Sequence, residues 1–166
     1  GGDKFSRNGP LAKGKGTLWE GGIRVPCIVR WPGKLPPGKV STQVGIMMDW
    51  SATTLKLARA KPPKDRPLDG MDLLPILAGE QRAKKRTLFW RRVGPNFVET
   101  HRAVRDGNWK FIDERSGKQQ LYNLAEDMGE KNNLAGEQQS KVAKMKKLLD
   151  KWENQVDPPL YPVSLK

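Results

Sequence analysis

The sequence predicts an α+β fold in which a C-terminal helix covers one face of a small antiparallel sheet of about four strands. From residue 87 onward, apolar and polar residues alternate with a period of two, as they do in strands with one buried face. Asp106-Gly107 separates two of these runs and is a strong signal for a hairpin turn. Residues 137–156 instead repeat their apolar side chains at helical spacing.

The four expected strands are short runs with β-branched or aromatic residues, bounded by turn residues. They cover residues 87–92, 101–105, 109–112 and 120–124. Because the second and third runs flank the hairpin turn, we expect them to pair antiparallel.

The C-terminal helix carries its apolar residues on one face and lysines on the other. The apolar stripe consists of Val142, Met145, Leu149, Trp152 and Val156. We interpret the segment as a helix that covers the sheet. A dimerising coiled coil is the alternative, although the pattern is shorter than the three or four heptads that a coiled coil usually requires.

The first half of the chain is less regular. Residues 1–22 are rich in glycine, lysine and polar groups, and we expect an irregular loop there. Residues 23–31 are the best strand candidate in this half because they are short, apolar and β-branched. Pro26 complicates this prediction, since proline cannot donate to a sheet ladder.

Two helices are expected between this strand candidate and the sheet. The first covers residues 49–58, with Asp49 as its N-cap. The second is short and covers residues 72–79, with Pro75 near its first turn and Gly79 at its end.

Composition excludes several classes of site. The chain has 166 residues with one cysteine and one histidine. These counts exclude an internal disulfide framework, a multi-cysteine zinc site and any mechanism that needs a histidine pair. No window approaches about 18 consecutive apolar residues, so we expect no transmembrane helix. The start at Gly1, without a signal peptide, indicates a processed chain or a piece of a longer protein.

The net charge is +13, and the basic excess lies in residues 1–118. Such a surface suits an anionic partner or substrate, and it equally suits solubility alone. Lys84-Lys85-Arg86 and Arg91-Arg92 are candidate patches for a sulfated polysaccharide or a nucleic acid. The sequence contains no recognised nucleic-acid motif, so nucleic acid is the less favoured of these two partners.

The candidate functional stretch is residues 14–26, GKGTLWEGGIRVP. Glycines on both sides of Lys15 let the backbone approach a ligand closely, and a lysine ammonium at such a point suits an oxyanion of phosphate or sulfate. Glu20 and Arg24 lie four residues apart, and we expect them to pair and brace the loop. The stretch lacks the P-loop pattern, and a basic turn without a ligand is the alternative.

Residues 14–26, together with RWPG at residues 30–33, closely resemble the sulfatase (arylsulfatase) family. Met48-Asp49-Trp50 with Leu55 resembles a degraded form of the family's asp-leu-x-pro-thr-leu helix. Further matching motifs follow in order: residues 66–75, RPLDGMDLLP; residues 103–110, AVRDGNWK; and residues 121–134, LYNLAEDMGEKNNL. The resemblance reaches about residue 155 and covers only the C-terminal third of a typical sulfatase.

The resemblance implies two parts. Residues 1–80 would be the end of an alkaline-phosphatase-like α/β catalytic domain, and residues 81–166 the C-terminal subdomain with the antiparallel sheet and its helix. The N-terminal remainder of the sulfatase would be the partner of this chain. Without it, apolar side chains of residues 23–77 would be exposed, and we expect self-association or chain swapping. These side chains are Val25, Ile28, Val29, Leu55, Leu57, Leu74 and Leu77.

The resemblance also assigns the site residues. Lys15 matches the family lysine that contacts the sulfate and the formylglycine hydroxyl, where it would stabilise charge on the sulfuryl oxygens. Lys13 is not the matching position. Cys27 lies outside the C-x-[PS]-x-R box in which formylglycine forms, so we expect a buried structural cysteine. We expect a structural or surface role for His101.

The family's calcium would be held by an early aspartate pair and by an Asp-Asn directly before the position of Gly1. We therefore expect no calcium ligand in this chain, and we expect Asp3 to be a solvated loop residue. In the whole enzyme, a gem-diol oxygen of formylglycine would attack the sulfur, and sulfate elimination would regenerate the aldehyde.

The expected function is sulfuric ester hydrolysis, with sulfated glycans or aryl sulfates as substrates of the full-length enzyme and no turnover by this chain alone. The parent is expected to be exported, as a periplasmic, secreted or lysosomal protein. A non-catalytic module that binds anions is the alternative.

Overall fold

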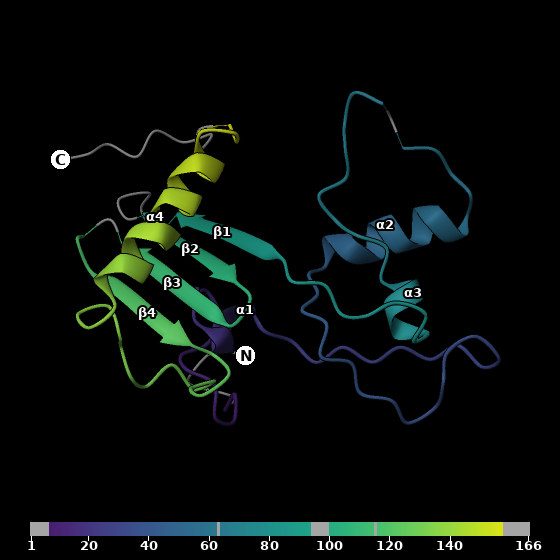
Figure 1. Cartoon of the computed structure of the whole chain (residues 1–166), viewed down its shortest axis with the longest axis horizontal. Coiled ribbons are helices and arrows are strands. Elements are labelled where there is room, and N and C mark those ends of the chain that lie inside the picture. The colour runs from purple at the N-terminus through teal and green to yellow at the C-terminus, as the bar shows by residue number, and fades with distance from the viewer. Residues whose placement is uncertain (1–6, 63, 94–99, 115, 158–166) are drawn as a thin grey trace. The chain divides into compact units, whose positions relative to one another are not determined.

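The structure is a computed structural model that describes residues 7–62, 64–93, 100–114 and 116–157. The chain forms two compact units (Figure 1). The first contains the chain up to Pro26 and from Arg86 onward, and the second contains Cys27–Lys85. The two sulfatase domains implied by the resemblance, divided near residue 80, have different bounds from these units and stay a prediction.

The first unit is built on a four-stranded antiparallel sheet with the strand order β1-β2-β3-β4. The strands are β1 (Thr87–Val93), β2 (Thr100–Asp106), β3 (Trp109–Glu114) and β4 (Gln119–Asn123). Asp106 pairs with Trp109 at the β2–β3 hairpin, and Gly107 adopts a φ of 63° in its turn. Because glycine adopts positive φ without steric cost, it suits this turn. The four expected strands and the hairpin are confirmed.

Helix α4 (Gln139–Glu153) covers one face of this sheet (Figure 1). Val142, Met145 and Leu149 are buried on its inner face. They form one core with side chains of β2, β3 and β4: Val104, Phe111 and Leu121. Burying this stripe supplies the hydrophobic stabilisation that a single solvated helix lacks. The interpretation of the segment as a covering helix is confirmed.

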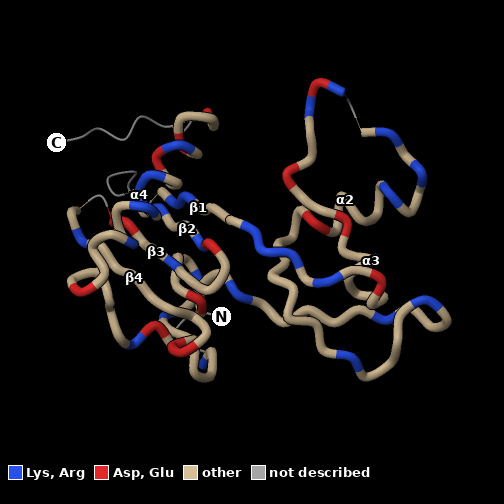
Figure 2. The backbone as a smooth tube through the Cα atoms, in the orientation of Figure 1, with Lys and Arg blue, Asp and Glu red and all other residues tan. Residues whose placement is uncertain are grey.

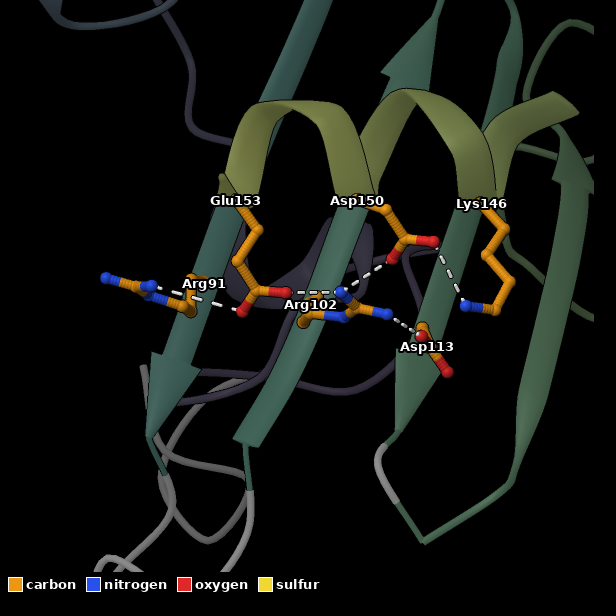
Figure 3. A network of polar contacts seen from close by, with 6 residues as sticks. All are labelled: Arg91, Arg102, Asp113, Lys146, Asp150 and Glu153. Atoms are coloured by element: carbon orange, nitrogen blue, oxygen red, sulfur yellow. Dashed lines mark hydrogen bonds and ion pairs between the residues drawn. The ribbon is translucent and has the colours of Figure 1, made fainter. Parts of the chain in front are cut away.

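A polar network anchors the C-terminal half of α4 to the same face (Figure 3). Arg102 on β2 donates to Asp113 on β3, and to Asp150 and Glu153 on α4. Arg102 is only 7% exposed. Burial by itself lowers the pKa of Arg102, but the hydrogen bonds and charges of Asp113 and Glu153 outweigh it and raise the pKa. The guanidinium therefore stays charged and joins three elements.

The opposite face of the sheet packs against the N-terminal segment. Helix α1 (Glu20–Ile23) lies on this side, behind the strands in Figure 1. Leu18 is buried there against side chains of β2, β3 and β4: Ala103, Ile112 and Tyr122. Trp19 and Ile23 pack against the same cluster. The sheet is thus a central layer, with α4 on one side and the segment around α1 on the other.

The prediction of a strand over residues 23–31 is wrong. Ile23 ends α1, and residues 24–31 form neither helix nor strand. A strand needs a partner for its backbone ladder, and among the described residues of Cys27–Lys85 there is no strand at all. Val25 and Ile28 are consequently 71% and 94% exposed. An apolar, β-branched sequence is therefore insufficient here, and Pro26 further weakens the ladder.

The second unit contains α2 (Met48–Leu57) and α3 (Leu74–Leu77), close to where both helices were expected. The prediction that Asp49 is the N-cap of α2 is wrong, because Met47 occupies the cap position. The fully buried Asp49 carboxylate instead accepts from the backbone N–H of Ile46 at 2.7 Å and of Met71 at 2.9 Å. It therefore joins the start of α2 to the segment after Gly70.

Exposure of the apolar side chains in residues 23–77 is uneven. Val25, Ile28, Val29 and Leu57 are exposed, as expected, whereas Leu55, Leu74 and Leu77 are half-buried.

No helix in the described part of the chain has the length and hydropathy to cross a membrane.

Candidate functional site

The candidate site is the loop around Lys15, which directly precedes α1. Lys15 is exposed, whereas Gly14 beside it is buried and Gly16 adopts a φ of 84°. The Lys15 ammonium makes no ion pair with any residue that the structure describes. The loop therefore presents an exposed lysine side chain to solvent, which suits contact with an oxyanion.

The backbone of this loop lies directly on the two glycines of α1. A Cβ at Gly21 would lie 2.3 Å from the carbonyl oxygens of Ala12 and Lys13. A Cβ at Gly22 would lie 2.3 Å from the Thr17 carbonyl oxygen. Contacts this close admit no side chain, so the glycine pair is what allows the loop to fold back onto the helix.

Hydrogen bonds hold the loop in this conformation. The N–H of Gly21 donates to the Ala12 carbonyl at 2.9 Å, and the Thr17 hydroxyl donates to the Gly14 carbonyl at 2.8 Å. The Asn8 side-chain amide donates to the carbonyls of Lys13 and Gly21, both at 3.0 Å. The backbone on both sides of Lys15 is thus fixed, although its side chain is free in solvent.

A buried ion triad lies at the base of the loop. Lys110 on β3 is fully buried, and its Nζ lies 2.9 Å from Oε1 of Glu20 and 2.8 Å from Oε1 of Glu130. The backbone N–H of Glu20 donates to the other Glu130 carboxylate oxygen at 2.6 Å. The three side chains come from the loop helix, the sheet and the segment after β4, so the triad joins distant parts of the chain.

Two arginines complete the charge balance around Glu20. The expected pair with Arg24 is confirmed at 3.5 Å, and Arg105 approaches the same carboxylate oxygen at 3.9 Å. Burial raises the pKa of Glu130, while the charge and hydrogen bond of Lys110 act in the opposite direction. Burial also lowers the pKa of Arg105, which the Glu20 carboxylate partly offsets.

Lys110 and Glu130 lie within two of the matching family motifs, residues 103–110 and 121–134, and the sequence reasoning did not place them at the site. The local pair of Glu20 and Arg24 could be found from its spacing, because four residues make one helical turn. Lys110 lies 90 positions after Glu20. No spacing rule links such residues, although a lysine between the apolar Trp109 and Phe111 of a strand was a usable signal of a buried charge.

The other candidate residues are dispersed. Lys13 is exposed with a φ of 57°. Cys27 is exposed and free, which corrects the expectation of a buried structural cysteine, because residues 24–31 pack into no sheet. His101 is half-buried on β2, opposite Arg92 and Glu114. Asp3 lies outside the described residues.

The two basic patches differ in how far their charges are already paired. Lys84 and Lys85 are exposed, but Arg91 is engaged by the Glu153 carboxylate at 3.9 Å and by the Asp157 carbonyl at 2.7 Å. Within the described ranges, no group of three or more His, Cys, Asp or Glu side chains could hold a metal ion.

Comparisons with known proteins identify the family. A family profile described as N-sulphoglucosamine sulphohydrolase, C-terminal, matches residues 14–155. The N-acetylgalactosamine-6-sulfatase of Canis lupus familiaris is 48% identical over 84 residues, which are 51% of this chain and 16% of the relative. A sulfatase of Formosa agariphila is 33% identical over 165 residues, which are 89% of this chain and 30% of the relative.

Solved structures agree with these relatives. The crystal structure of Ps i-CgsB in complex with k-i-k-neocarrahexaose is similar with a TM-score of 0.83 at 27% identity, over 96% of this chain and 35% of that chain. This chain thus spans about a third or less of the proteins that it matches. The profile match and these similarities show that the chain belongs to the sulfatase family, in which it corresponds to a C-terminal portion.

Proposed function

We propose that this chain is the C-terminal part of an enzyme that hydrolyses sulfate esters, and that Lys15 contacts the sulfate of the substrate. The observation that carries this proposal is the placement of Lys15. The family match begins at Gly14, and the residue that follows is an exposed lysine on a loop whose backbone is fixed. A lysine with a held backbone and a free ammonium can approach an anion without reorganising the loop.

The chemical role of Lys15 follows from its charge. Negative charge accumulates on oxygen atoms around the sulfur as the ester bond breaks, and a cation already in position stabilises it. A lysine acts here as a point charge with three donors, without the bidentate geometry of arginine. We assign Lys15 this electrostatic role and no part in proton transfer.

The nucleophile and metal implied by the resemblance belong to other parts of the enzyme in this proposal. A formylglycine would supply the attacking oxygen, and calcium would polarise the sulfate ester. Cys27 is followed by Ile28-Val29-Arg30 and does not fit the formylglycine box. We therefore propose that the chain alone has no turnover and that the N-terminal remainder, from an exported parent, completes the site.

Sulfated glycans are the substrate class that we favour over aryl sulfates. Two relatives support this choice by their descriptions, an N-acetylgalactosamine-6-sulfatase and a protein in complex with k-i-k-neocarrahexaose. The relatives do not all point to one substrate class, because the steryl-sulfatase of Mus musculus is 49% identical over 83 residues. The net charge of +13 also suits a polyanionic glycan.

The test uses the whole enzyme that contains this chain, assayed with a panel of sulfated glycan oligosaccharides and an aryl sulfate. We expect Lys15→Ala to lower kcat by about 100-fold, as removal of one stabilising donor does in other enzymes. Lys13→Ala, two residues away and also exposed, is the matched control and should retain activity. Clear hydrolysis by the pure 166-residue chain, abolished by Lys15→Ala, would contradict the proposal that the chain alone has no turnover.

A module that binds sulfated polysaccharide without catalysis is the second candidate. The observation that favours it is a row of exposed lysines on the outer face of α4, namely Lys144, Lys147 and Lys151. Figure 2 shows how widely basic residues are spread over the chain, which is equally typical of a solvated surface. Two results together would support this candidate. The whole protein should show no turnover, and its binding should fall steeply with salt and prefer sulfated glycan to DNA.

A further inference from the structure

We propose that Lys110 and Glu130 are positioning residues for Lys15: through the buried triad with Glu20, they hold the Lys15 loop on the sheet in one fixed position. This inference rests on the proposed function for the role of Lys15. It gives the C-terminal sheet a part in the site, although the side chains of Lys110 and Glu130 are fully buried.

The triad can fix a position because its members are charged and enclosed. The side chains of Lys110 and Glu130 are 0% exposed, and that of Glu20 is 3% exposed. A buried charge is satisfied only when its partners occupy one arrangement, since any displacement leaves a desolvated ion without a partner. Apolar contacts such as those of Leu18 have no such directional requirement.

A short covalent path connects the triad to Lys15. Glu20 begins α1, and its backbone N–H is itself bonded to Glu130. The next two residues are the glycines on which the backbone of Ala12–Thr17 rests at distances that admit no Cβ. A displacement of Glu20 therefore displaces the surface that supports the Lys15 loop.

The segment that carries Glu130 makes a second contact with the same region. A Cβ at Gly129 would lie 2.8 Å from the carbonyl oxygen of Pro10, so the two backbones pass in direct contact. Glu130 adopts a φ of 52°, a left-handed conformation that is strained for a glutamate. Its carboxylate is thereby aimed at both the Glu20 N–H and the Lys110 ammonium. Strained backbone of this kind persists where surrounding contacts impose it.

The first part of the experiment asks whether the triad holds the loop. Amide hydrogen exchange is followed in the whole enzyme, at Thr17, Glu20 and Gly21, for Lys110→Met. We expect exchange at these amides to accelerate by at least about tenfold, while amides of β2 and β3 stay protected. The matched control is Lys146→Met, which removes a lysine that pairs with Asp150 on the opposite face of the sheet. If the loop amides stay protected in Lys110→Met, the proposal is overturned.

The second part asks whether the triad positions Lys15, by a double-mutant cycle on sulfate ester hydrolysis. We expect Lys110→Met to lower kcat by about tenfold or more in the presence of Lys15, because displacement of a charged group by about 1 Å is costly. In a Lys15→Ala background it should have no further effect, since the residue that it positions is gone. A merely structural role would lower kcat equally in both backgrounds and would overturn the inference.

A second variant covers the case in which Lys110→Met fails to fold. Glu130→Gln keeps an oxygen that can accept from the Glu20 N–H but removes one charge, so it should show the same non-additivity to a smaller degree. If Lys15→Ala itself leaves kcat unchanged, the proposed function of Lys15 fails, and the inference that depends on it fails with it. If Lys15→Ala lowers kcat and both triad variants leave it unchanged, only the further inference fails.

Discussion

Arg102 and Asp113 lie directly opposite each other on β2 and β3, and the Arg102 guanidinium donates to the Asp113 carboxylate across the strands. The same guanidinium reaches Asp150 and Glu153 on α4 (Figure 3). Side-chain exposures are 8% for Arg102 and 9% for Asp113, so this cross-strand pair is largely desolvated. The sheet and its covering helix are therefore joined by charge as well as by apolar packing.

Replacement of Arg102 by methionine should destabilise the first unit by about 3 kcal/mol. The substitution keeps apolar volume but leaves Asp113 buried without its cationic partner, and the penalty comes chiefly from that carboxylate. Urea denaturation followed by near-UV circular dichroism measures the change. Lys146→Met is the control, because its pair with Asp150 is about half exposed on both sides and should contribute less than about 1 kcal/mol. Equal effects of the two substitutions would contradict this account.

The network also predicts a dependence of stability on pH. Burial by itself would raise the pKa of Asp150, but Lys146 and Arg102 outweigh it, so the pKa lies below its ordinary value of 3.8. A depressed folded-state pKa contributes stability above 3.8 that is lost as pH falls through the folded value. Asp150→Asn removes this contribution, so its stability should fall less steeply than that of the wild type below pH 3.8. Parallel curves of unfolding free energy against pH would contradict the prediction.

The elements of the first unit could be predicted from sequence because their signals are local. The hairpin needs a glycine with positive φ at one turn position, and Gly107 supplies it beside Asp106. The stripe of α4 repeats within four turns and packs on the sheet as expected. The strand expected over residues 23–31 failed for the opposite reason. Its residues satisfy strand propensity, but a strand exists only with a partner, which propensity does not report.

The candidate site was predictable in part. Lys15 was singled out by the glycines around it and by a family resemblance, and the pair of Glu20 and Arg24 by its helical spacing. The triad could not be predicted, because Lys110 and Glu130 reach Glu20 only after the sheet has formed and the segment after β4 has folded back. Asp49 shows the same limit, since its sequence context favours a cap while its carboxylate binds the distant Met71 N–H.

Substitution of Gly22 by alanine should open the Lys15 loop. The new methyl group would lie 2.3 Å from the Thr17 carbonyl oxygen and 2.7 Å from the Gly14 carbonyl oxygen. Both are backbone atoms, so relief requires movement of the loop, at a cost of about 1–3 kcal/mol. Hydrogen exchange at Thr17 should accelerate together with a lower Tm. Gly136→Ala is the matched control, because a Cβ there meets no atom within 4 Å. A Tm unchanged from wild type in Gly22→Ala would contradict the close packing.

The exposed apolar side chains of the second unit predict that the isolated chain self-associates. Ile28 and Val40 are 94% and 93% exposed, and Met47 is 76% exposed. Exposed apolar surface on a monomer favours association, since burial stabilises by about 25 cal/mol per Å² removed from water. Light scattering over a range of concentrations should show mass rising above that of the 18.7 kDa monomer. Ile28→Ser together with Val40→Ser should shift the mass toward the monomer, whereas Lys39→Ser, beside Val40, should leave it unchanged. A monomer at high concentration would show that this exposed apolar surface does not drive association, and the expectation of self-association would be wrong.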